Sequence, residues 1–126
     1  MHDRPTAAEL VEAVREYLER DVMEATAGRV QFLTRVAINA LSTVQRELEV
    51  GGAQDAAQHA RLVAIFSDNA DLRTAEFGTA ELEQHLANAI RDDTLTAQQL
   101  SDATAHIRAT VRDKLEVANP KYLGGA

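Results

Sequence analysis

The sequence predicts an all-α protein, a single-domain up-and-down bundle of four long helices and one shorter helix over residues 1–126. The 45% apolar fraction is mostly alanine, leucine and valine, with no tryptophan and few aromatic residues, a profile typical of packed helices. Apolar residues recur at helical spacing along most of the chain. All six glycines fall at expected helix ends or in the tail, at positions 28, 51, 52, 78, 124 and 125.

The first helix is expected over residues 7–27. Thr6 and Glu9 match a capping box, in which the threonine oxygen accepts a backbone N–H and the glutamate side chain accepts the N–H of the threonine. Gly28 offers a stop after the helix. The apolar residues that recur at helical spacing are Leu10, Val11, Val14, Leu18 and Val22.

The second helix, from about residue 29 to residue 50, has the clearest pattern. Gly51 and Gly52 are expected to end it, and a third helix is expected over residues 53–66. The following segment, SDNADLRTAEFG, lacks periodicity and is expected to be a loop. The apolar face of the second helix consists of Leu33, Val36, Ala37, Ala40, Leu41, Val44 and Leu48.

Two further helices are expected after this loop. Thr79 is expected to cap the fourth, which carries Leu82, Leu86 and Ile90 and ends near residues 92–93. Thr96 and Gln99 form a second capping box that opens the fifth helix.

The fifth helix is expected to end at Asn119-Pro120, because proline has no N–H to donate and disfavours helical geometry in the residue before it. A flexible tail is expected over about residues 124–126.

Composition excludes several classes of function. The net charge of −7 argues against nucleic acid as a partner. The absence of cysteine removes disulfides, thiolate catalysis and thiolate metal sites, and suits a cytoplasmic location. No run of 18 apolar residues occurs, so we expect no membrane span.

Motifs that carry chemistry are missing. Each of His59, His85 and His106 follows an acidic residue by four positions, and three such pairs could converge on a metal. Ordinary helix contacts explain the same spacing, and neither Glu-x-x-His nor His-Glu-x-x-His occurs. The sequence also lacks a P-loop, a dinucleotide fingerprint and a Gly-x-Ser-x-Gly turn. We therefore expect no catalytic residue, no metal and no cofactor.

The second helix carries a second, mixed face with Phe32, Arg35, Asn39 and Arg46. An aromatic residue among hydrogen-bonding groups indicates contact on that side with a partner or ligand. Alternatively, the helix is central, and Arg35 and Asn39 bind loop carbonyls or the C-terminal end of a neighbouring helix.

The NPKYL stretch places Lys121, Tyr122 and Leu123 after the fifth helix. Either Tyr122 and Leu123 fold back over the bundle near the first two helices, or they anchor a partner.

Three segments, HDRPTAAEL, RVAINAL followed by RELE, and RATVRDKLEVANPKYL, resemble a bacterial family of small helical proteins of unknown function. This family includes the small kinase-partner protein of levulinate catabolism. The resemblance extends from His2 to Leu123.

The resemblance implies a non-catalytic accessory subunit. In that family the small protein is encoded beside an aminoglycoside-phosphotransferase-like kinase, which phosphorylates 4-hydroxyacyl-CoA, and beside an acyl-CoA dehydrogenase-like enzyme. The alternatives are a free-standing helical module that binds acyl-CoA and a module that self-associates as a homo-oligomer. The residues expected to bind a partner are Arg4, Phe32, Arg35, Asn39, Arg46, Lys121, Tyr122 and Leu123.

Overall fold

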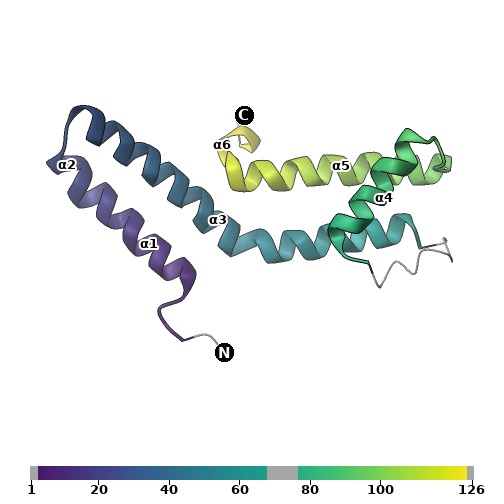
Figure 1. Cartoon of the computed structure of the whole chain (residues 1–126), viewed down its shortest axis with the longest axis horizontal. Helices are drawn as coiled ribbons and strands as arrows, with labels where there is room; N and C mark the ends of the chain where they lie inside the picture. The colour runs from purple at the N-terminus through teal and green to yellow at the C-terminus, as the bar shows by residue number, and fades with distance from the viewer. Residues whose placement is uncertain (1–2, 68–76, 125–126) are drawn as a thin grey trace. The chain divides into compact units, whose positions relative to one another are not determined.

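The computed structural model describes residues 3–67 and 77–124, and all regular structure within them is helical. The predicted all-α class is therefore confirmed. None of the described helices is long and apolar enough to cross a membrane. In chain order the elements are α1 (Ala7–Tyr17), the π-helical η1 (Leu18–Val22), α2 (Met23–Ala25), α3 (Gly28–Ile65), α4 (Thr79–Arg91), α5 (Ala97–Ala118) and α6 (Pro120–Leu123) (Figure 1).

The chain forms two compact units. Unit 1 contains residues 1–51 and 116–126, and unit 2 contains residues 52–115. Most of the predicted loop, residues 68–76, and the end of the predicted tail, residues 125–126, lie outside the described residues.

Side chains cap two of the helices as predicted. Thr6 Oγ1 accepts the N–H of Glu9 at 3.2 Å, and Glu9 Oε1 accepts the N–H of Thr6 at 3.1 Å. The same reciprocal pair joins Thr96 and Gln99 at 2.9 and 3.1 Å. The prediction for Thr79 is wrong, because Gly78 occupies the N-cap and Thr79 is the first helical residue.

The two capping boxes differ because Glu9 ionises and Gln99 does not. Hydrogen bonds from the Thr6 backbone N–H, from the Thr6 side chain and from Arg4 hold the pKa of Glu9 below its ordinary value of 4.5. A depressed folded-state pKa means that this stabilisation is present above about pH 4.5 and is lost as the pH falls through the lower value.

We therefore expect the amide proton resonance of Thr6 to titrate with a midpoint below pH 4.5 in NMR spectra, while that of Thr96 stays in place. A Thr6 resonance that does not respond to pH would contradict the capping geometry.

Helix α3 runs unbroken from Gly28 to Ile65, so the predicted stop at Gly51-Gly52 is wrong. The predicted third helix is instead the last part of α3. Glycine in a helix interior costs only about 1 kcal/mol relative to alanine, which continuous hydrogen bonding on both sides can offset. Of the described glycines, only Gly28 has a positive φ, at 64°.

Alanine substitutions at Gly28 and Gly52 should change the free energy of unfolding in opposite directions. Gly52→Ala is expected to raise the free energy of unfolding by about 0.5–1 kcal/mol, because a Cβ there meets no atom within 4 Å. Gly28→Ala is expected to lower it by about 1–2 kcal/mol, because of the positive φ. Thermal unfolding followed by circular dichroism measures both. Destabilisation by Gly52→Ala would contradict a continuous α3.

The first predicted helix is correct at its start, but it contains a π-helical turn and ends at Ala25. Gly28, predicted as its stop, is the first residue of α3. After α1 a π-helical turn leads into the short α2, and Thr26 is extended, with φ −127° and ψ 163°. The Gln31 side chain donates to the carbonyls of Met23 and Thr26, both at 3.0 Å, and so closes the turn into α3.

In unit 1, α1 and the first part of α3 lie side by side and antiparallel (Figure 1). Arg15 Nε donates to Gln45 Oε1 at 3.0 Å. On α3 the side chains turned from solvent are the buried Thr34 and the half-buried Ile38 and Leu41. The predicted apolar face is therefore correct in part. Its Ala37 and Leu41 are half-buried, but Ala40 is exposed and Leu33, Val36, Val44 and Leu48 are each 45–48% exposed.

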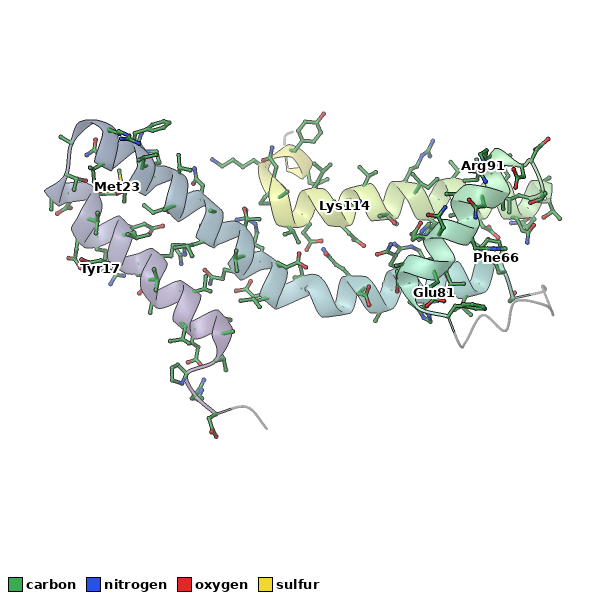
Figure 2. All side chains as sticks on the ribbon, viewed as in Figure 1. Tyr17, Met23, Phe66, Glu81, Arg91 and Lys114 are labelled. Carbon is green, nitrogen blue, oxygen red and sulfur yellow. The ribbon has the colours of Figure 1, made fainter. Side chains whose placement is uncertain are left out.

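Unit 2 has a compact apolar core. Phe66, labelled in Figure 2, directly follows α3 and is 2% exposed. Its ring meets that of His85 edge to face, with centroids 4.7 Å apart. On α4, Leu82 and Leu86 are buried, whereas Ile90 is 43% exposed. The core cluster comprises Leu62, Ile65, Phe66, Leu82, Leu86 and Ala103.

Candidate protein-binding site

Burial is distributed unevenly between the two units. In unit 1, Val117 is the one apolar residue with less than 9% exposure in the part of the chain that the structure describes, and α1 has no buried residue. Large apolar side chains are instead half-exposed along both α1 and the first part of α3. This exposed apolar surface on two helices makes unit 1 the candidate for an interaction site.

The outer face of α3, defined here as Phe32, Arg35, Val36 and Asn39, contains the most exposed large apolar residue of this surface. Phe32 is 62% and Val36 48% exposed. With 3.6 residues per turn, Phe32 lies opposite Leu41, and this face is therefore turned away from α1. Within residues 3–67 and 77–124, no hydrogen bond or ion pair engages the side chains of Arg35 or Asn39.

Arg46 has a different role from the rest of the predicted set. Its Nε donates to the carbonyl oxygen of Val117 at 2.7 Å, and its Nη2 donates to Thr43 Oγ1 at 3.3 Å. The predicted alternative, a polar side chain that binds the C-terminal end of a neighbouring helix, is therefore realised by Arg46 rather than by Arg35 or Asn39.

The NPKYL stretch ends α5 as predicted and then forms α6, a single helical turn. The N–H of Tyr122 donates to the carbonyl oxygen of Asn119 at 3.0 Å. Tyr122 is 73% exposed, so the expectation that its ring packs over the bundle is wrong, whereas Leu123 is half-buried. Lys121 is exposed.

The remaining predicted residue, Arg4, is exposed and pairs with Glu9 at 3.3 Å. All eight predicted residues belong to unit 1. The exposed members are Arg4, Phe32, Arg35, Asn39, Lys121 and Tyr122.

Unit 2 contains a polar cluster that sequence reasoning missed. His106 is 1% exposed, and its Nε2 lies 2.6 Å from Glu83 Oε1. Its Nδ1 accepts a hydrogen bond from Arg61 Nε at 3.1 Å, which assigns the ring proton to Nε2. Gln58 Nε2 donates to the same carboxylate oxygen at 2.8 Å. The cluster thus joins α3, α4 and α5.

This cluster is suited to structure rather than to proton transfer. Both ring nitrogens of His106 already have partners, so no lone pair is free to accept a proton from a substrate. The sequence pointed to Asp102 as the partner of His106, but the actual partners come from other helices. No signal at fixed sequence spacing could have found them.

His59 and His85 contact other groups and do not join this cluster. His59 Nε2 lies 2.8 Å from the carbonyl oxygen of Phe77, and His85 packs against Phe66. The described residues contain no group of three or more potential ligands that could hold a metal ion.

Comparison with known proteins places the chain in a family. The family described as Domain of unknown function (DUF6285) matches residues 24–122. The chain belongs to this family. Comparisons with curated proteins and with solved structures find no match.

The DUF6285 match contains most of the candidate site. It begins in α2 and includes all of α3, α4 and α5, and therefore the outer face of α3. It reaches Tyr122 but not α1 or Arg4. The exposed residues that define the site are therefore mostly those of the DUF6285 region.

Proposed function

We propose that this DUF6285 protein is a non-catalytic accessory subunit that binds an aminoglycoside-phosphotransferase-like kinase acting on 4-hydroxyacyl-CoA in acid catabolism. The observation that carries the proposal is the outer face of α3, where Phe32 is 62% exposed beside Arg35 and Asn39. An aromatic ring with a neighbouring arginine is typical of the residues that contribute most to protein interfaces.

The polar groups of this face suit a protein partner. The Arg35 guanidinium presents a planar set of donors that fits a carboxylate in two hydrogen bonds. From Gly28 to Arg46 the chain contains no acidic residue, so no carboxylate of this stretch competes for that guanidinium. A kinase surface with an apolar pocket for Phe32 and an acidic rim for Arg35 would complement it.

The identity of the kinase rests on the resemblance to the levulinate kinase-partner family. In this proposal the kinase supplies the nucleotide site and catalysis, and the accessory subunit stabilises the kinase or completes its acyl-CoA site. The complex would act in the cytoplasm, with the acyl-CoA dehydrogenase-like enzyme as a further partner.

The acyl-CoA-binding alternative receives less support. The phosphates of CoA require clustered cations. A hollow of about 550 Å³ beside the start of α1 is instead lined by Asp3, Pro5, Thr6, Ala7, Ala8 and Leu48. This lining offers a carboxylate and apolar groups to an anionic ligand, which favours protein binding as the primary role.

Co-expression with the kinase encoded beside this protein tests the proposal. We expect the two proteins to co-elute in size-exclusion chromatography and the kinase to phosphorylate 4-hydroxyacyl-CoA faster with the small subunit than without it. Separate elution together with unchanged kinase activity would overturn the proposal. Saturable binding of acyl-CoA to the isolated chain, measured by calorimetry, would favour the alternative.

A further inference from the structure

Unit 1 has a second uncovered surface on the α1–α3 hairpin. We call it the open hairpin face. Tyr17, labelled in Figure 2, is 58% exposed at one end of its α1 stripe. Every member is between 45% and 58% exposed, which is unusual for large apolar side chains on two packed helices. The members are Leu10, Val14 and Tyr17 of α1 and Leu33, Val44 and Leu48 of α3.

Helical geometry places both stripes on the same side of the hairpin. On α1 the exposed apolar residues lie about a quarter turn to one side of the half-buried Val11 and Leu18. On α3 they lie about a quarter turn, in the same rotational sense, from the buried Thr34 and the half-buried Leu41. Because the two helices are antiparallel, the same sense of rotation directs both stripes toward one side.

Such a hairpin resembles half of a four-helix bundle. Two packed helices bury one apolar seam, whereas a bundle also buries the faces beside that seam. Because unit 1 buries so few apolar side chains internally, covering the open hairpin face would supply hydrophobic stabilisation that the hairpin alone lacks.

The two helices differ in net charge. Residues 7–25, which form α1, η1 and α2, contain six acidic residues and two arginines. The part of α3 that carries its exposed apolar residues, residues 28–51, contains three arginines and two glutamates, a net charge of +1 against −4 for residues 7–25. An acidic helix is therefore repelled less by this part of α3 of another molecule than by a second acidic helix.

We propose that the open hairpin face binds the same face of a second copy of this chain, forming a four-helix bundle. In this dimer the α1 of each copy packs antiparallel on the first part of α3 of the other, and the two α1 helices lie diagonally. If α1 of one copy packed on α1 of the other instead, the two acidic helices would lie side by side. The outer face of α3 lies on a different side of the helix, so each copy keeps its kinase-binding face.

The dimer has a defined register. The contact between Arg15 and Gln45 places Val14 and Val44 at the same level along the hairpin. A two-fold axis parallel to the helices preserves that level. Val14 of one copy therefore faces Val44 of the other, whereas the two Val14 residues are separated by the bundle core.

Because the chain contains no cysteine, this register can be tested by directed disulfides. We expect a mixture of the Val14→Cys and Val44→Cys chains to form a covalent dimer under mild oxidation, with the 14–44 cross-link identified by mass spectrometry. Neither variant oxidised alone should form it. A covalent dimer from Val14→Cys alone, or none from the mixture, would overturn the proposed pairing.

The mass of the protein in solution provides the second readout. Light scattering on a size-exclusion column should give twice the 13.7 kDa of one chain. Val44→Glu should weaken dimerisation at least about tenfold, because it buries a carboxylate in the interface. Val111→Glu is the matched control, since Val111 of unit 2 is 51% exposed and should leave the dimer intact.

A wild-type chain that stays monomeric at every concentration would overturn the proposal. This holds also if the kinase is then found to cover the open hairpin face. Dimerisation that survives Val44→Glu would also overturn it. Circular dichroism of each variant confirms that it retains its helices.

Discussion

Replacing Phe66 with alanine is expected to lower the free energy of unfolding by about 3–5 kcal/mol, since it removes a large buried side chain and leaves a cavity. Phe66 is 2% exposed and packs within the core cluster of unit 2 and against the ring of His85. A small domain has about 5–15 kcal/mol of stability in total, so this loss should be evident. Urea denaturation followed by far-ultraviolet circular dichroism measures it.

Phe32→Ala is the matched control, because it truncates the same side chain at a position that is 62% exposed. We expect a change within about 0.5 kcal/mol in the isolated chain. Equal losses from the two substitutions would contradict the assignment of Phe66 to a core and of Phe32 to a surface.

The double variant Phe32→Ala with Arg35→Ala is expected to weaken binding to the kinase by about 30-fold to 700-fold while the protein stays folded. Aromatic and arginine residues at the centre of an interface typically cost about 2–4 kcal/mol when truncated, which corresponds to such factors. Isothermal titration calorimetry with the purified kinase measures the affinity.

Its control is Val111→Ala with Arg112→Ala, which removes an apolar side chain and an arginine from exposed positions on α5 in unit 2. We expect this variant to bind the kinase as the wild type does. A wild-type affinity for the Phe32 and Arg35 variant would show that the outer face of α3 is not the docking site.

The predictions that succeeded depended on local chemistry. Thr6 with Glu9 and Thr96 with Gln99 cap their helices as expected, because a capping box lies within four consecutive residues. Pro120 ends α5 for an equally local reason, its missing N–H. The all-α class follows from composition and helical periodicity, which need no knowledge of distant contacts.

The predictions that failed depended on a balance of energies or on contacts between helices. Gly51 and Gly52 indicated a break, but the cost of a glycine in a helix is small enough for the rest of α3 to offset. Periodicity identified apolar residues on α3 without deciding which would face α1. Thr34 and Ile38 are turned from solvent, and Leu33 is 46% exposed.

The candidate site was predictable in part. Phe32, Arg35 and Asn39 stood out because they combine an aromatic ring with hydrogen-bonding groups on one helix face, and the structure leaves all three exposed. The role of Arg46 was not predictable, since its partner, the Val117 carbonyl, lies 71 residues away in sequence. The pairing of His106 with Glu83 joins two helices in the same way.

Hydrogen–deuterium exchange of this protein with and without the kinase tests the central claim most directly, because protein binding slows exchange of the backbone amides that it covers. We predict that adding the kinase slows exchange over residues 28–46, the first part of α3 that carries Phe32 and Arg35. Unchanged exchange over residues 28–46, with protection confined to the described residues of unit 2, would contradict the account.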